Sequence, residues 1–221
     1  MKLKVSTNSK ALEDFGGSSY IAKSGIYDVT IKFASVDVTK NGAESVNFNL
    51  DYNGNDQTIY GPYVQNTDGN VNEIGARLIN ALAVVVGMGD GDDYEMDEEE
   101  HVVGKDKTAK TFSVITNFTD KPVKIQLQEE YSINPKTNDI QKRMVIKNFF
   151  REDGASAKEA TDNADIGKQL AIVTEKYASN VTYKDNLTPE KVAEWKASKA
   201  GNKPTAPVAK VANKPSGSLF V

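Results

Sequence analysis

The first half of the chain alternates between apolar and polar residues with a period of two, as a half-buried β-strand does. Within residues 25–33, the apolar side chains of one face are Tyr27, Val29, Ile31 and Phe33. The same alternation recurs in residues 44–52 and 57–64. Asn-Gly pairs at 41–42 and 53–54 favour tight turns between these segments. The pattern predicts an antiparallel meander of three strands.

The hydrophobic period changes near residue 70, where apolar residues recur every three or four positions. They predict a helix ending near Gly87 and are Val71, Ile74, Leu78, Leu82 and Val85. Strand patterns return at 110–118, 121–133 and 140–150, and residues 155–180 are loosely helical. A mainly β chain with a helix between its third and fourth strands has the element order of an OB-fold barrel. We therefore expect an OB-fold-like antiparallel barrel followed by a flexible C-terminal tail.

Composition divides the chain into four parts: an N-terminal arm at 1–24, the barrel at 25–154, a helical extension at 155–190 and a basic tail at 191–221. Four of the seven prolines lie in the last 33 residues, and five lysines and no acidic residue follow position 194. Such a composition favours an extended linker. The chain closes with the apolar residues Leu219, Phe220 and Val221. They are either a docking peptide for a partner protein or a frayed end.

Charge is unevenly distributed along the sequence, although the overall formal charge is -4. Residues 1–100 carry seven basic and 17 acidic side chains, whereas residues 101–221 carry 20 basic and 14 acidic ones. Segregation of this kind favours a basic face that meets a polyanion and an acidic segment with a separate role.

The usual catalytic residues are scarce. The chain has no cysteine, which excludes thiolate metal sites and cysteine nucleophiles, and its single histidine, His101, has no sequence partner that indicates a triad. Phosphate-loop and EF-hand patterns both fail, because Glu99 and Pro62 stand where glycine and glutamate are required. We expect a protein that is not an enzyme and that needs no cofactor and no metal ion.

A run of acidic residues occupies a glycine-rich segment at 89–100. Two-metal sites draw carboxylates from separate rigid elements, so a contiguous run favours a solvated loop over a metal-dependent nuclease. It has a possible second use as a DNA mimic, or as an edge that repels DNA.

In the later strands, cationic and aromatic residues alternate along the sequence with the apolar residues that we expect in the core. In residues 121–133 the inward set is Val123, Ile125 and Leu127, which leaves Lys124 outward; in residues 140–150, Arg143, Lys147 and Phe149 share one face. Lysines and arginines that contact phosphates, together with exposed rings that stack on bases, suit binding of single-stranded nucleic acid. The alternative interpretation is that the aromatic residues belong to the core and the cations form a solvated face. The candidate binding residues are Tyr60, Lys105, Lys107, Lys110, Lys124, Arg143, Lys147 and Phe149.

Residues 24–33, 40–50 and 74–87, together with Gly104-Lys105 and the segment 143–150, resemble the small single-stranded DNA-binding proteins of bacteriophages. The resemblance covers about residues 20–155. It implies an OB-fold that coats and protects transient single strands during phage replication or recombination. Proteins of this group often recruit partners through a flexible tail that is acidic, whereas the tail here is basic, which suits contact with DNA instead.

These observations predict a non-sequence-specific single-stranded DNA-binding protein whose tail contacts replication or recombination proteins. No run of residues is long and apolar enough to cross a membrane, and the first residues lack a secretory apolar core, so we expect no membrane partner and a location in the host cytoplasm. The alternative is a phage structural or assembly protein that uses the same β-barrel for interactions. We also expect deletion of residues 195–221 to leave folding intact.

Overall fold

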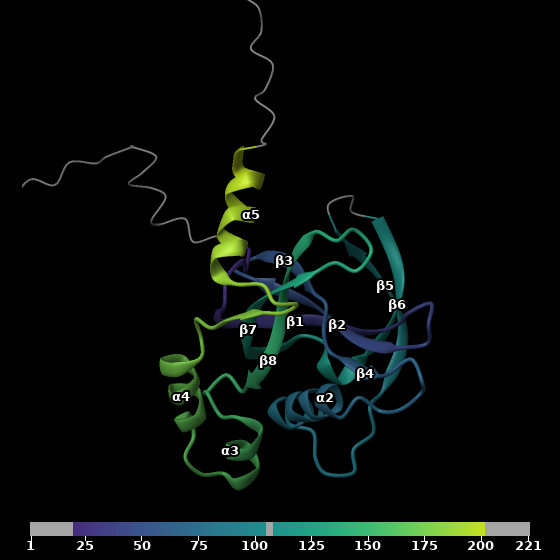
Figure 1. Cartoon of the computed structure of the whole chain (residues 1–221). Helices are drawn as coiled ribbons and strands as arrows, with labels where there is room; N and C mark the ends of the chain where they lie inside the picture. Colours follow the sequence, from purple (N-terminus) through teal and green to yellow (C-terminus); the bar gives the residue numbers. More distant parts are fainter. Residues whose placement is uncertain (1–19, 105–107, 202–221) are drawn as a thin grey trace, which may run out of the picture.

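The computed structural model describes residues 20–104 and 108–201 (Figure 1). The strands within these residues are β1 (Gly25–Val38), β2 (Glu44–Tyr52), β3 (Asn55–Ile59), β4 (Tyr63–Gln65), β5 (Met96–Val103), β6 (Thr108–Ile115), β7 (Lys121–Ile133), β8 (Ile140–Phe150) and β9 (Val181–Tyr183). The helices are α2 (Glu73–Val85), the 3₁₀ turn η1 (Thr116–Phe118), α3 (Ala157–Asp162), α4 (Lys168–Lys176) and α5 (Pro189–Gly201). The chain is mainly β, as predicted.

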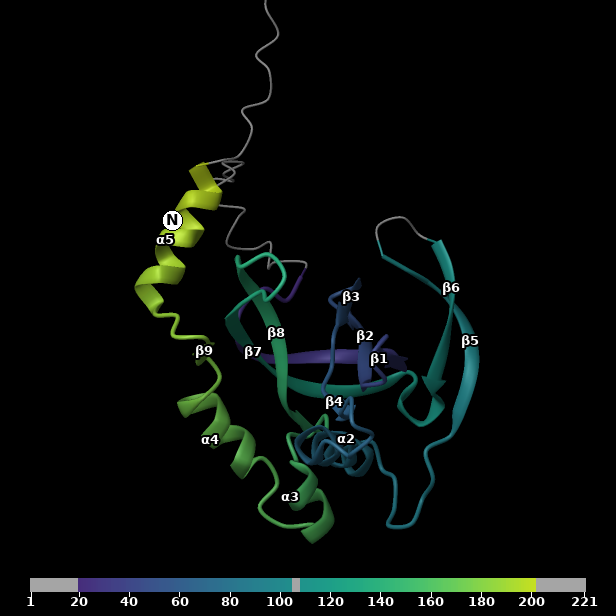
Figure 2. The same ribbon diagram turned by 45° about the vertical axis from the view of Figure 1, so that its right-hand side comes forward.

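Strand β1 organises the sheet because its two halves have different neighbours. Residues 25–31 pair with β7, residues 35–36 pair with β6, and residues 30–38 pair with β2 on the other side. One path through the sheet is β3-β2-β1-β6-β5, and β7 carries β8 on its far side. A sheet whose central strand changes partners cannot stay flat, and it curls into a half-barrel (Figure 2).

The predicted strands 44–52, 121–133 and 140–150 coincide with β2, β7 and β8. The turn between β2 and β3 has positive φ at Asn53 and Gly54, as the Asn-Gly pair predicts. The core lies inside the curl and includes fully buried Ile31, Phe48, Leu50, Ile125 and Leu127.

The prediction for Phe33 is wrong, because the alternation of β1 is broken at Lys32. Ile31 pairs with Leu50, but the next pair along is Phe33 with Asn49, so the register shifts by one residue. A β-bulge of this kind turns later side chains to the opposite face. Ala34 therefore enters the core, and the Phe33 ring packs instead under the β5–β6 hairpin.

Helix α2 begins at a cap in which the Asn72 side-chain oxygen accepts a hydrogen bond from the Gly75 amide at 3.1 Å. The helix packs against β4, β8 and α3. Its buried face is offset from the predicted stripe, since Val71 precedes the helix and Ile74 is 82% exposed, while Ile79 is buried. The predicted stripe is therefore wrong at its first two positions.

Two boundaries before and after α2 also differ from the prediction. The expected third strand is divided at residues 60–62 into β3 and β4, so α2 follows the fourth strand. The acidic run does not remain a loop throughout: its second half forms β5, whose backbone pairs with β6 along residues 96–103. The carboxylates of Asp97, Glu98 and Glu100 still face solvent, whereas half-buried Glu99 lies 2.7 Å from His101 Nε2.

The C-terminal part is more structured than its composition predicts. Residues 155–180 form α3 and α4 as expected, but residues 181–183 add strand β9 parallel to β7. The tail prediction is wrong for residues 191–201, which belong to α5. This helix is anchored by buried Val192 and by Trp195, whose ring lies 6.3 Å from that of Tyr131.

Most of the expected N-terminal arm, at residues 1–19, lies outside the described residues. The rest of the predicted tail, residues 202–221 with Leu219, Phe220 and Val221, lies outside them too.

Candidate nucleic-acid interface

A cavity of about 690 Å³ lies between the β3–β4 edge of the sheet and strand β8. One wall is formed by Tyr60, Pro62 and Tyr63, and the opposite wall by Lys142, Arg143 and Met144, with Lys184 beside them. We call this the β3–β8 cavity. Strands β3 and β8 lie near each other in both views of the ribbon (Figures 1 and 2).

The two tyrosines of the first wall are unusually exposed for aromatic side chains. Tyr60 is 74% exposed and Tyr63 is 48% exposed, whereas the strand residues Phe48, Tyr131 and Phe149 are buried. Exposed rings on one cavity wall are available to stack on a flat ligand, which a buried ring is not.

Two glycines set the position of both tyrosines: Gly61, which lies between them in the chain, and Gly75 on α2. A Cβ added at Gly61 would lie 1.7 Å from the carbonyl oxygen of Val46, and one added at Gly75 would lie 1.8 Å from that of Tyr63. The backbone is also tied to β2, because the Val46 amide donates to the Pro62 carbonyl at 3.1 Å. Only glycine permits these approaches, so the tyrosine wall is held between β2 and α2.

The cations of the second wall differ in how far their charge is neutralised. Lys142 Nζ lies 3.1 Å from a carboxylate oxygen of Glu129, and Lys184 Nζ lies 2.9 Å from one of Glu130. Arg143 is exposed and forms no ion pair within residues 20–104 and 108–201. Arg143 is therefore the cavity cation best placed to bind an external anion.

A polar network behind β8 holds Lys142 in place. Glu129 is nearly buried, and burial alone would raise the pKa of its carboxyl group. Hydrogen bonds donated by Tyr131, at 2.8 Å, and by Lys142 outweigh that effect, so the pKa of Glu129 is lowered. Burial, together with the bond to Glu129, raises the pKa of Tyr131. Glu129 is thus a fixed anion that neutralises Lys142.

Of the residues predicted from sequence, the structure brings Tyr60 and Arg143 together in this cavity. Lys124 lies elsewhere, opposite Asp28 in the β1–β7 pairing and in an ion pair with it. Lys110 and Lys147 are exposed on β6 and β8 but do not line the cavity. Lys105 and Lys107 lie outside the described residues.

The prediction that Phe149 shares an exposed face with Arg143 and Lys147 is wrong. Leu127 pairs with Ile146 and Gln126 with Asn148, so Lys147 is an extra residue in β8. This bulge reverses the alternation, and Phe149 is only 1% exposed, with its ring 5.4 Å from that of Phe48.

Three residues of the cavity were missed in the sequence. Tyr63 has the same parity in the sequence as buried Ile59, but the break at Gly61-Pro62 resets the strand alternation. Lys142 falls on the face opposite Arg143 in a simple strand pattern. Lys184 follows β9, a three-residue strand with no detectable period. Of the three features that place these residues in the cavity, only the Gly61-Pro62 break can be recognised in the sequence.

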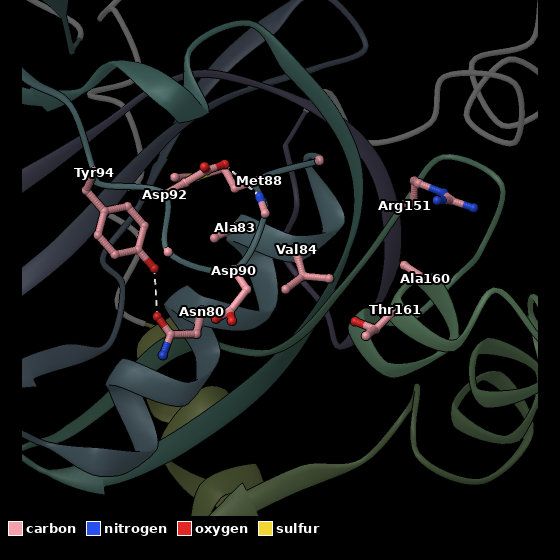
Figure 3. A pocket seen from close by; sticks show the side chains of 13 residues that line it. Asn80, Ala83, Val84, Met88, Asp90, Asp92, Tyr94, Arg151, Ala160 and Thr161 are labelled. Carbon is pink, nitrogen blue, oxygen red and sulfur yellow. Dashed lines mark hydrogen bonds between the residues drawn. The ribbon is translucent and has the colours of Figure 1, made fainter.

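A second cavity, of about 860 Å³, lies between the C-terminal end of α2, the loop after it and α3 (Figure 3). It is lined by Asp90 and Asp92, and its single cation, Arg151, is paired with Asp153 at 2.6 Å. Its acidic residues outnumber its cation, whereas the β3–β8 cavity is lined by Lys142, Arg143 and Lys184 against Asp37 and Glu130, so the β3–β8 cavity is the better candidate for nucleic acid.

No group of histidine and acidic side chains within the described ranges is arranged to hold a metal ion. None of the helices in the same part of the chain has the length and apolarity needed to span a membrane. The sequence matches no protein-family model, and no curated protein matches it.

Proposed function

We propose that this protein binds single-stranded DNA without sequence specificity, as a non-enzymatic phage replication or recombination protein in the host cytoplasm. The observation that carries the proposal is the β3–β8 cavity, in which two exposed tyrosines face an arginine with no ion-pair partner in the described chain. Unpaired bases stack on such rings, and a guanidinium binds phosphate oxygens with paired hydrogen bonds.

The strand connections support an OB-type barrel as the scaffold of this activity. A meander from β1 to β4 is followed by α2, and the later hairpin β7–β8 returns to pair with the first half of β1. In this interpretation, β5 and β6 are a hairpin inserted between the helix and the last two barrel strands.

The test is fluorescence anisotropy of a labelled oligothymidine titrated with the full chain at several salt concentrations. We expect binding that weakens steeply with salt, because each neutralised phosphate releases counterions. Tyr60→Ala and Tyr63→Ala should each weaken binding roughly 5- to 150-fold, the equivalent of about 1–3 kcal/mol per stacked base. Arg143→Ala should weaken binding and reduce the salt slope by about one.

Matched controls distinguish the cavity from the rest of the surface. Tyr177, the C-cap of α4, is 49% exposed and outside the cavity, and Lys136 is an exposed cation in the β7–β8 turn. Tyr177→Ala and Lys136→Ala should bind like the wild type. Absence of binding at low salt, or equal losses in the cavity variants and the controls, would contradict the proposal. A stable oligomer that does not bind DNA would favour a phage structural or assembly protein instead.

A further inference from the structure

The second cavity described above, which we call the α2–α3 cavity, combines an apolar floor with an acidic rim. Ala83, Val84 and Met88 supply the floor, and Asp90 and Asp92 lie on the loop that leaves α2. Figure 3 shows Tyr94 across this loop, where its hydroxyl donates a hydrogen bond to Asn80 at 2.7 Å. A ligand that fits must be apolar at its tip and positively charged beside it.

Two further features make the rim electronegative. The last turn of α2 contains no basic residue, so the partial negative charge of its carbonyl end is not offset. Arg151, which borders the cavity, is tied to Asp153 by hydrogen bonds from both Nε and Nη2. The cavity therefore attracts cations.

The C-terminal segment of this chain has the complementary chemistry. Residues 202–221 contain three lysines and no acidic residue, and they end in Leu219, Phe220 and Val221. We propose that this segment docks in the α2–α3 cavity of a second copy of the chain, with its apolar end on the floor and its lysines beside the acidic loop.

The position of α5 favours docking of this segment on the cavity of a second copy over docking on the cavity of its own chain. Val192 is buried, and Lys196 Nζ lies 4.8 Å from the centre of the Tyr131 ring, so α5 is fixed to β7. Figure 1 shows α5 and α2 at opposite ends of the molecule. Residues 202–221 follow α5 in the sequence, so docking on the cavity of the same chain would require them to cross from one end of the molecule to the other.

Docking of this kind is head-to-tail, because the donor and the acceptor are different surfaces. Each copy presents one tail and one cavity, so two copies can exchange tails and close a pair, or the contact can extend from copy to copy. It requires no DNA, and its test is therefore independent of the function proposed above.

The absence of cysteine allows a direct test with single-cysteine full chains. Ser218→Cys keeps the apolar end intact, and Thr161→Cys places a thiol at an exposed position lining the cavity. The control is Thr174→Cys, because Thr174 is also exposed, lies on α4 outside the cavity, and donates the same hydrogen bond to the carbonyl four residues earlier. Each experiment mixes the Ser218→Cys chain with one of the other two, and one of the two chains carries a mass tag.

Under mild oxidation without DNA, Ser218→Cys and Thr161→Cys chains should form a mixed disulfide much faster than Ser218→Cys and Thr174→Cys chains. Asp90→Lys in the acceptor should slow the reaction roughly fivefold or more, as expected from losing an ion pair worth about 1 kcal/mol. Asp93→Lys should not, since Asp93 is exposed beside the cavity but does not line it.

Equal reaction with Thr161→Cys and Thr174→Cys, or insensitivity to Asp90→Lys, would overturn the proposal. A chain carrying both Ser218→Cys and Thr161→Cys tests whether the tail in the cavity comes from a second copy or from the same chain. If it forms only the disulfide within one chain, the tail docks on its own cavity, and the proposed contact between copies is wrong.

Discussion

The imidazole ring of His101 lies parallel to the phenyl ring of Phe33, with the ring centres 3.8 Å apart and an angle of 8° between the planes. This stack joins β5 to β1, although only two residue pairs, at Ser35 and Val36, connect β6 to β1. The backbone pairing between the hairpin and β1 is short, so the stack is a further contact that attaches the hairpin, beside that of Phe33 with Phe112.

We therefore expect His101→Ala to loosen the β5–β6 hairpin. The stack should contribute about 1 kcal/mol beyond burial, so hydrogen exchange should rise in β5 and β6 amides but not in β7 and β8. Glu100→Ala, on the exposed face of β5, is the control and should leave exchange unchanged. Unchanged exchange in the His101 variant would show that the backbone pairs alone hold the hairpin.

Replacing Gly75 by alanine should destabilise the protein, although alanine normally stabilises a helix interior by about 0.5–1 kcal/mol. The added Cβ would meet the Tyr63 carbonyl at 1.8 Å, so we expect a loss of about 1–3 kcal/mol in the free energy of unfolding in urea. The control is Gly89→Ala, where the new Cβ would lie 3.5 Å from Asp92. Equal stability of the two variants would argue against a close contact between α2 and β4.

Phe149→Ala tests the burial of a residue that the strand pattern placed outside. Removal of this ring from beside Phe48 should lower the free energy of unfolding by about 3–5 kcal/mol. The folded fraction should retain wild-type affinity for oligothymidine. A normally stable variant with a selective loss of DNA affinity would mean that the ring acts at the surface.

The stability contributed by Glu129 should depend on pH. Because the pKa of its carboxyl is lowered by folding, its contribution is complete above the unfolded pKa of about 4.3 and is lost as the pH falls through the folded pKa. Glu129→Gln should therefore lower the unfolding free energy by about 1–2 kcal/mol at pH 7, where Tyr131 loses a charged acceptor. The difference in unfolding free energy between Glu129→Gln and the wild type should become smaller at acid pH.

Exposed Glu152 provides the comparison, and Glu152→Gln should have little effect at either pH. Urea unfolding of both variants at pH 7 and below pH 4 measures the difference. A gap for Glu129→Gln that stays constant across that range would contradict the role assigned to its charge.

The sequence by itself determined the parts of the fold that depend on neighbouring residues. The bounds of β2, β7 and β8, the turn at Asn53-Gly54 and the presence of α2 all follow from alternation, turn chemistry and helical spacing. These signals act over a few residues, and the same short-range preferences operate in the folded chain. For the candidate site, they identified Tyr60 and Arg143 as separate surface residues.

Only the tertiary structure decided which side chains meet. The bulges at Lys32 and Lys147 turn Phe33 and Phe149 away from their expected faces, because pairing partners on other strands set the register. The β3–β8 cavity likewise requires the curl of the sheet around β1 to bring residues 60–63 opposite residues 142–144. Contacts between distant segments depend on how the whole sheet packs, and no local pattern specifies that packing.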